Sequence, residues 1–277
     1  MNRKTFLIGC LLLCFLPNCT AATTKEDILT QARKIKAAAP AEPPEAPVVK
    51  LSPLSEKEKL VYKAKFLGIS IGTFIIMNNG KTTFNGQEAY CFELNVKTLP
   101  FFSILFKTKA RYVSYMDTQE LVVLRHEEYV KGGALLESAV DFDYKNLTAA
   151  YKNFIDHQES TVKIPNKLLD VLSGGFYLRM MPLELGDTVD LNIYADQKIY
   201  NYTGVLSSKT KVNLPNYGKQ DAYSFKPYLF LDGKEIKKIS AEIFFSTTAP
   251  TKTLRASMKT LLGKVHVVLV EGYETLQ

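Results

Sequence analysis

The residues best suited to chemistry in this sequence lie in one predicted helix over residues 167–181. At about 100° per residue, Asp170, Ser173 and Tyr177 share one narrow polar stripe along that helix. Arg179 falls on the other side, in the middle of an apolar arc. Because an unpaired buried charge is very costly, we expect Arg179 to be largely buried and paired with a carboxylate.

Two hypotheses for Arg179 remain open. In the first, it anchors an anionic head group or a carboxylate of a ligand, with Asp170 and Tyr177 as further binding residues. In the second, it forms a structural ion pair with a residue of a neighbouring strand, for instance Asp141 or Asp143. The two hypotheses differ in whether the partner of the guanidinium is a ligand or the protein itself.

No other group of residues predicts catalysis. His126 and Glu127 are neighbours on a predicted strand, so their side chains point to opposite faces and cannot converge. His266 alternates with apolar residues and is expected on an exposed sheet face. Asp141 and Asp143 share a strand face, as glycosidase acids would, but acidic residues two apart are common by chance. The sequence has no zinc-ligand spacing, glycine-rich phosphate loop or Gly-x-Ser-x-Gly motif, so we predict no catalytic residue, metal or cofactor.

The first 21 residues have the three parts of a secretory signal. Arg3 and Lys4 make a basic start, residues 6–16 are an apolar run, and Ala21 is a small residue suited to cleavage. The apolar run is shorter than the ~20 residues that a membrane-spanning helix needs. The sequence thus predicts an exported protein of the periplasm or cell envelope, from which residues 1–21 are removed.

Three of the four cysteines fall within or beside the apolar part of this signal. Cys19 is well placed for lipidation, although Asn18 stands where a smaller residue is expected, so a lipid anchor at Cys19 stays open as a second hypothesis. Cys91 would be the one thiol left after cleavage. Without an intramolecular disulfide, the mature domain must owe its stability to a packed core.

The composition is that of an ordinary folded protein, with 46% hydrophobic and 23% charged residues, which excludes a mostly disordered chain. The formal net charge is +7, but the lysines are scattered singly and are expected on a solvated sheet face. No basic cluster is interleaved with aromatic residues, so we expect no nucleic-acid partner. A weak attraction to anionic lipid head groups or polysaccharide, and with it peripheral membrane association, remains open.

A Pro- and Ala-rich stretch separates the signal from the folded domain. Residues 22–54 are predicted to be a linker, in which prolines favour extended backbone and residues 25–39 could form a short helix that would be marginal alone. Residues 55–277 are predicted to form a single β-rich domain, with its ordered part beginning near Leu60.

Apolar and polar residues alternate with a period of two from Leu60 onwards. Some eleven or twelve short strands joined by short turns predict an antiparallel meander that forms a strongly curled sheet or partly closed barrel. The helix at 167–181 is expected to pack on the concave side, and Gly174-Gly175 could permit a bend or a close backbone approach. Hairpin turns are predicted at 78–81, 132–133, 232–233 and 263–264. The predicted strands are 60–66, 69–77, 88–96, 110–116, 121–130, 135–144, 189–195, 200–212, 222–231, 239–246, 254–261 and 265–270.

Several spaced segments resemble one known family. The run LDVLSGGFYLR at 169–179, followed by Leu185-Gly186-Asp187, is similar to the bacterial exported family known as domain of unknown function 3108. Segments 62–72 and 111–117 agree with the same family, and the resemblance extends from about residue 60 to the C-terminus. It implies a β-rich secreted domain, and it implies no established activity and no catalytic residues.

Three functions are compatible with these observations. The first is a non-enzymatic binding or carrier protein of the envelope for a lipid-like or other amphiphilic ligand, with Arg179, Asp170, Tyr177 and Phe102 as candidate ligand-binding residues. Phe102 lies in an apolar run at 101–106 that either contacts an amphiphile or is buried in the core. The second is a structural partner in an envelope assembly that binds through a sheet edge, and the third is a polysaccharide or lipid hydrolase.

Overall fold

The computed structural model describes residues 24–38, 51–99, 109–132, 134–236, 241–260 and 263–272. Within these residues the chain is mainly β, with one continuous sheet of 16 strands and two α-helices. The predicted signal, Cys19, Phe102 and most of the proline-rich linker lie outside the described residues. In the described part of the chain, no helix combines the length and the apolar character that crossing a membrane requires.

The strands follow one another as antiparallel hairpins, as the sequence predicts. The first half of the sheet contains β1 (Lys59–Phe66), β2 (Ile69–Phe84), β3 (Gln87–Thr98), β4 (Lys109–Asp117), β5 (Val123–Gly132), β6 (Ala134–Asp143), β7 (Thr148–Asn153) and β8 (Glu159–Lys163). The second half contains β9 (Leu169–Asp170), β10 (Thr188–Ala195), β11 (Lys198–Leu214), β12 (Gly218–Leu231), β13 (Lys234–Glu235), β14 (Ala241–Ser246), β15 (Thr253–Thr260) and β16 (Gly263–Glu271).

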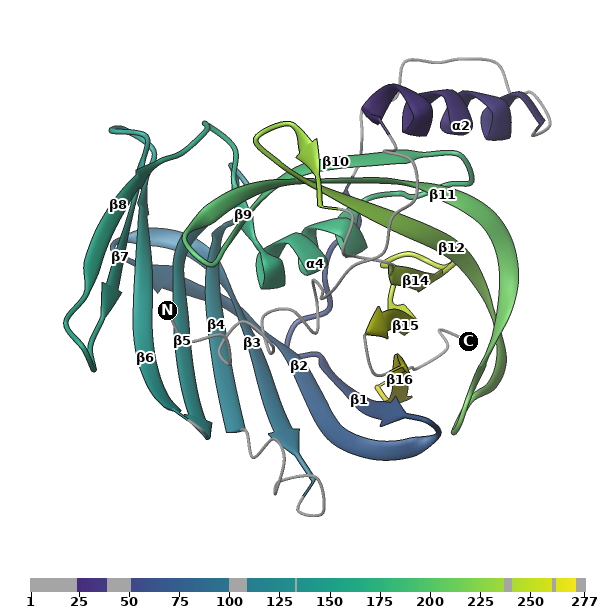
Figure 1. The fold of residues 1–277 in the computed structure, drawn as a ribbon, viewed down its shortest axis with the longest axis horizontal. Coiled ribbons are helices and arrows are strands. Elements are labelled where there is room, and N and C mark those ends of the chain that lie inside the picture. The colour runs from purple at the N-terminus through teal and green to yellow at the C-terminus, as the bar shows by residue number, and fades with distance from the viewer. Residues whose placement is uncertain are drawn as a thin grey trace.

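The spatial order of the strands runs from β8 down to β1, then through β16, β15, β14, β12, β11 and β10 to β9. β13 pairs with β12 beside this path, and only β9 and β10 pair in parallel. The sheet curls until its last part lies against β5, where the amide of Val123 donates to the carbonyl of Leu168 at 3.0 Å. The sheet is therefore strongly curled but not closed, which confirms the predicted fold class (Figure 1).

Helix α4 (Val171–Met180) lies inside the curl of the sheet (Figure 1). Its Phe176 ring stacks on Phe92 of β3, with ring centroids 3.9 Å apart. The predicted helix is too long at its start, because Leu169 and Asp170 form β9 beside β10. Asp170 is instead the N-cap of α4, and its side chain accepts from the Ser173 amide in a capping box. The concave side is thus occupied by α4 and core side chains.

Two features of the strands differ from the sequence-based prediction. No hairpin forms at residues 78–81, because β2 continues to Phe84 and turns at Asn85-Gly86. Residues 78–81 make a bulge, in which the buried Asn78 side chain donates to the carbonyl of Ser55 and accepts from the amide of Gly80. The prediction also missed β7 and β8, whose short segments TAAYKN and ESTVK offer little apolar alternation.

Helix α2 (Lys25–Ala38) lies on the outside of the sheet, next to β11 (Figure 1). Its Ile28 and Ala32 are buried against Val205 and Phe230. A helix that would be marginal alone therefore gains stability from packing one apolar stripe. Leu54, at the end of the predicted linker, is buried in the main core. Residues before Leu60 therefore already pack against the β-rich domain.

Candidate functional site

Three of the four residues predicted from the sequence to bind a ligand lie among the described residues, and these three do not meet in one site. Asp170 and Arg179 lie at opposite ends of α4, and Tyr177 packs, partly buried, against the main core. Phe102 lies outside the described residues. Three polar groups remain as candidates: the ion pair of Arg179, the hydrogen bonds around Asp170, and a lysine-lined hollow on another part of the sheet.

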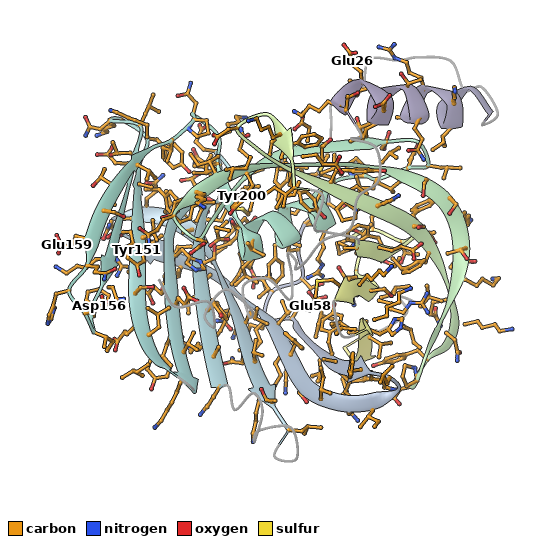
Figure 2. The ribbon with its side chains drawn as sticks, in the orientation of Figure 1. Glu26, Glu58, Tyr151, Asp156, Glu159 and Tyr200 are labelled. Carbon is orange, nitrogen blue, oxygen red and sulfur yellow. The ribbon has the colours of Figure 1, made fainter. Side chains whose placement is uncertain are left out.

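Arg179 is buried and paired with a carboxylate, as predicted. Its Nη2 lies 2.6 Å from Oε2 of Glu58, its Nε donates to the carbonyl of Thr251 at 2.8 Å, and its guanidinium stacks 5.1 Å from the centre of the Phe176 ring. The Arg179 and Glu58 side chains are only 5% and 9% exposed. Figure 2 places Glu58 inside the curl of the sheet. The guanidinium is therefore held largely by the protein, although Nη1 has no hydrogen-bond partner among the described residues.

The predicted partners of Arg179 were wrong. Asp141 binds Arg125 with two hydrogen bonds of 2.6 and 2.8 Å, and Asp143 accepts from backbone amides of the turn that follows it. Glu58 precedes β1 and is 121 residues away from Arg179 in the sequence. The curl of the sheet brings the end of α4, with Arg179, next to Glu58. No local sequence pattern predicts this contact.

Asp170 is the centre of a second buried cluster, in which its two carboxylate oxygens contact different residues. Its Oδ2 lies 2.7 Å from Nδ1 of His126 on β5, and its Oδ1 accepts from the amide and hydroxyl of Ser173 at 2.6 and 2.7 Å. Burial alone would lower the pKa of His126, but the adjacent Asp170 carboxylate outweighs it and raises that pKa. Burial would raise the pKa of Asp170, but His126 and Ser173 hold it below its ordinary value.

This order of groups does not suit a serine hydrolase. In such an enzyme the histidine contacts the serine hydroxyl and takes its proton. Here Asp170 stands between Ser173 and His126, so the hydroxyl of Ser173 donates to a carboxylate, and both Ser173 and Asp170 are fully buried. The cluster instead caps α4 and ties it to β5. Sequence reasoning separated His126 from Glu127 but had no signal for its contact with Asp170.

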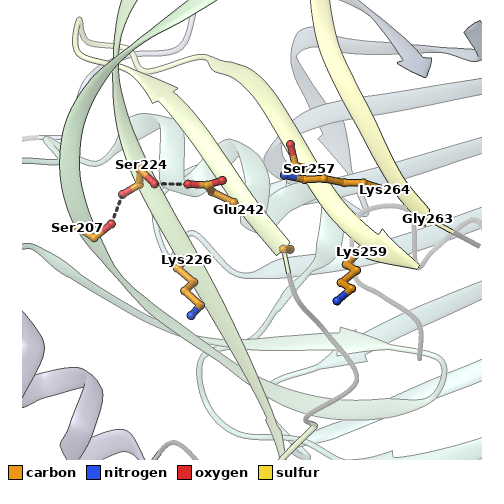
Figure 3. Close-up of a pocket in the computed structure, with 9 residues that line it drawn as sticks. Ser207, Ser224, Lys226, Glu242, Ser257, Lys259, Gly263 and Lys264 are labelled. Carbon is orange, nitrogen blue, oxygen red and sulfur yellow. Dashed lines mark hydrogen bonds between the residues drawn. The ribbon is translucent and has the colours of Figure 1, made fainter. Parts of the chain in front are cut away.

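A polar hollow of about 450 Å³ lies across β11, β12, β14, β15 and β16 (Figure 3). Strand pairing builds it, because Glu242 lies opposite Ser257 and Lys259 lies opposite Lys264. We call it the lysine hollow, and its described lining consists of Ser207, Ser224, Lys226, Ala241, Glu242, Ser257, Lys259, Gly263 and Lys264.

The lysine hollow is suited to an anion. It has three lysines and one carboxylate, and that carboxylate, Glu242, accepts from the hydroxyl of Ser224 at 3.0 Å. Ser257, a second hydroxyl of the lining, lies 2.9 Å from Nδ1 of His266. Partial burial, followed by the nearby charges of Lys264 and Arg255, lowers the pKa of His266.

His266 was predicted on an exposed face, but it is partly buried and hydrogen-bonded. The lysine hollow itself was missed. Its lysines come from strands separated by up to 38 positions, between Lys226 and Lys264, and each one alone looks like a solvated residue. Metal binding finds no support, since the described residues contain no group of three His, Cys, Asp or Glu side chains that could hold an ion.

Comparison with known proteins gives a family and a fold. The sequence profile of a family of proteins of unknown function, DUF3108, matches residues 61–270. A comparison with curated protein sequences finds no match. Among solved structures, a β-barrel-like protein of the unknown-function family DUF1849 from Brucella abortus superposes with a TM-score of 0.52 at 12% identity, covering 82% of this chain and all of the other.

Two further structures are similar at lower scores. One is a protein from Bacteroides fragilis with a YmcC-like fold, described as a candidate exported protein, with a TM-score of 0.33, 7% identity and coverage of 80% of this chain and 97% of the other. The other is a candidate lipoprotein from Parabacteroides distasonis, with a TM-score of 0.35, 11% identity and coverage of 80% and 98%. The comparison with the Brucella protein supports a β-barrel-like fold and carries no activity.

Proposed function

This chain belongs to the DUF3108 family, and from that premise we propose that it is a non-enzymatic binding protein of the bacterial cell envelope whose lysine hollow holds the anionic head group of an amphiphile. The observation that carries the proposal is that three lysines, Lys226, Lys259 and Lys264, line one hollow together with three serine hydroxyl groups. Lysine ammonium groups bind phosphate and carboxylate as point charges, and serine hydroxyls add hydrogen bonds.

The location of the ligand differs from the first expectation. A carrier that held an apolar tail inside the curl would need free space there, whereas Phe92 and Phe176 stack at the centre of the concave side. The lysine hollow lies elsewhere, across the strands from β11 to β16. The proposal therefore concerns recognition of a head group, and the envelope location is supported by the N-terminal sequence.

The binding experiment uses soluble short-chain lipids as probes. Dihexanoylphosphatidylglycerol should bind the full chain in a calorimetric titration, and dihexanoylphosphatidylcholine should bind more weakly. A variant with Lys226, Lys259 and Lys264 changed to Gln should lose about tenfold or more in affinity for the anionic probe, because each lysine supplies a charge-assisted contact that solvent partly screens. A matched variant with three exposed lysines elsewhere, Lys34, Lys145 and Lys219, changed to Gln should bind like the wild type.

His266 offers a second measurement. Partial burial and then the charges of Lys264 and Arg255 lower the pKa of His266; an anion in the lysine hollow should raise that pKa, and an NMR titration of the His266 ring detects the change. Inorganic phosphate in place of the lipid probe distinguishes a site for free phosphate from a site for a lipid head group. Equal affinity of the two triple variants for the anionic probe, with an unchanged His266 pKa, would refute the proposal.

A structural partner bound through a sheet edge is the second candidate, because β8 pairs with β7 alone and ends the sheet. A hydrolase is less well supported. The Ser257–His266 contact resembles part of a catalytic triad, but the acid of the lysine hollow, Glu242, contacts Ser224, and no contact between Glu242 and His266 occurs among the described hydrogen bonds.

A further inference from the structure

The hairpin turns of the sheet alternate between two ends of the molecule. Because consecutive strands are antiparallel, the turns β1–β2, β5–β6, β7–β8 and β15–β16 gather at one end, and β2–β3, β4–β5 and β6–β7 gather at the other. The first end follows the lower edge of the sheet in Figure 1. The two ends differ in chemistry, and we call them the apolar end and the polar end.

The apolar end carries most of the large hydrophobic side chains that are exposed. Leu67 is 74% and Ile69 60% exposed beside the β1–β2 turn, and Leu135 is 50% exposed beside the β5–β6 turn. Phe154 and Ile155, in the β7–β8 turn, are 40% and 43% exposed. These five are the majority of the seven large hydrophobic residues that are exposed in the described part of the chain. The five residues form separate apolar tips on three hairpins of this end.

The described turns at the polar end do not carry exposed large apolar side chains. They are Asn85-Gly86 between β2 and β3, a stretch with Gln119 and Glu120 between β4 and β5, and Lys145-Asn146 between β6 and β7. All of these residues are exposed and polar or glycine. The part of the sheet from β1 to β8 therefore presents polar turns on one side and leucine, isoleucine and phenylalanine on the other.

A row of lysines adjoins the apolar tips. Lys97, Lys109 and Lys131 lie directly opposite one another on β3, β4 and β5, and Lys131 lies opposite Leu135. All three lysines are exposed, and none forms an ion pair with another described residue. Like charges that face each other across strands destabilise a sheet, so an anionic partner beside this row would relieve a repulsion.

The carboxylates at this end lie away from the lysine row, and one of them is paired with a lysine of its own. Glu159 binds Lys152 at 2.8 Å, and Asp156 lies in the β7–β8 turn; Figure 2 shows both at one side of the sheet. Glu137 is exposed on β6. These acids lie on β6, β7 and β8, whereas the lysine row crosses β3, β4 and β5. The positive charge is therefore concentrated beside the tips of Leu67, Ile69 and Leu135.

We propose that the apolar end docks on an anionic lipid bilayer, with the tips in the head-group region and the lysine row against lipid phosphates. Separate apolar projections along one edge, with a collar of lysines behind them, match an interfacial membrane contact, where apolar burial and attraction to anionic lipids add. A protein partner would be expected to fill a continuous patch or groove instead. The inference does not depend on ligand binding in the lysine hollow.

Site-specific fluorescence tests the insertion. The full chain, with its four cysteines replaced by serine, receives one new cysteine at a time, Leu67→Cys, Leu135→Cys or, at the polar end, Gln119→Cys, and each is labelled with the polarity-sensitive dye NBD. With vesicles of phosphatidylglycerol and phosphatidylcholine, emission from positions 67 and 135 should shift to the blue, and emission from position 119 should not. Absence of a shift at the tips, or an equal shift at position 119, overturns the proposal.

Charge is tested by vesicle sedimentation. Changing Lys97, Lys109 and Lys131 to Gln should weaken binding to phosphatidylglycerol-containing vesicles about fivefold for each lysine, as about 1 kcal/mol per residue near an anionic surface implies. The matched triple variant at Lys34, Lys145 and Lys219 should bind like the wild type. The role of the lysines is contradicted if the lysine-row variant binds anionic vesicles as tightly as the wild type does. It is also contradicted if the wild type binds pure phosphatidylcholine vesicles as tightly as vesicles that contain phosphatidylglycerol.

Discussion

At the scale of single residues, buried charges in this protein are satisfied by partners that are remote in sequence. Arg179 meets Glu58, and Asp170 meets His126, across 121 and 44 positions. Both pairs fasten α4 to the surrounding sheet, one near each end of the helix. Removing one member of such a buried pair leaves the other charge without a partner. The cost of that unpaired charge is larger than the net stability that the intact pair contributes.

Removing Arg179 should therefore be severely destabilising. Arg179→Ala leaves Glu58 buried without its main partner, and we expect the free energy of unfolding to fall by about 3–5 kcal/mol, measured by urea denaturation. The double variant Glu58→Gln with Arg179→Met should recover part of this loss, since the carboxylate and the guanidinium are both removed and Lys252, 3.5 Å from Glu58, is the one charge of this group that remains. Arg125→Ala, whose partners Glu127 and Asp141 are more exposed, should cost about 1 kcal/mol or less. An Arg179→Ala protein that unfolds at the wild-type urea concentration would contradict the assignment.

The His126–Asp170 pair predicts a pH dependence of stability. The folded-state pKa of His126 is raised, so its contribution is full below the unfolded value of about 6.5 and is lost as the pH rises through the folded value. The folded-state pKa of Asp170 is lowered, so its contribution is present above about 3.9 and is lost as the pH falls through the folded value.

The matched variant His126→Gln keeps a hydrogen-bond donor but cannot titrate. The difference in unfolding free energy between wild type and His126→Gln should be largest between about pH 5 and 6.5 and should shrink at higher pH. Urea denaturation at a series of pH values gives this difference. If it is independent of pH, the two side chains do not form a charged pair in the folded protein.

At the scale of elements, the glycine pair in α4 has two different roles. A side chain added at Gly174 would have its Cβ 2.7 Å from Cδ1 of Ile193 on β10, whereas nothing lies within 4 Å of the same position on Gly175. The sequence raised the possibility of a close approach at this pair without saying which glycine makes it. Gly174 is the contact point between helix and sheet, and Gly175 is free of that constraint.

Two alanine substitutions separate these roles. Gly174→Ala should lower the free energy of unfolding by about 1–3 kcal/mol, because the added methyl group must displace the buried Ile193. Gly175→Ala should raise it by up to about 1 kcal/mol, because alanine favours the helix and meets no neighbour. Thermal melts of both variants provide the comparison. Equal effects of the two substitutions would mean that α4 does not pack on β10 in this way.

At the scale of the whole molecule, the sheet fixes where the apolar tips, the lysines and α2 lie on the surface. One end carries apolar tips and a lysine row, the lysine hollow extends across β11 to β16, and α2 binds to the outside of β11. A predicted linker and signal precede this domain. A protein that was tethered near a membrane could present both basic surfaces to anionic molecules there.

Export is the prediction that belongs to this scale. Expressed with its own N-terminus in a Gram-negative host, the protein should appear outside the cytoplasm and begin at Ala22, since residues 1–21 have the order of a secretory signal. N-terminal sequencing and intact mass identify the start. A start at Cys19 with the added mass of a lipid would establish the anchored form instead. An intact Met1 on a cytoplasmic protein would contradict export in either form.

Local signals in the sequence were sufficient for the class of fold. Alternation with a period of two located most of the strands, the proline-bounded apolar run located α4, and spaced segments pointed to the family whose profile matches residues 61–270. These features depend on neighbours within a few residues. For the same reason, an Asn-Gly dipeptide misled the prediction at 78–81, where Gly80, with a φ of 84°, lies in a bulge and not in a hairpin turn.

The sequence by itself determined that this chain is a curled antiparallel β protein with one internal helix and a buried arginine in need of a carboxylate. Only the tertiary structure decided that the carboxylate is Glu58, that Asp170 pairs with His126, and that lysines from separate hairpins converge. The physical reason is that strand register and the curl of the sheet set these distances. Both depend on packing of the whole core, which no window of a few residues contains.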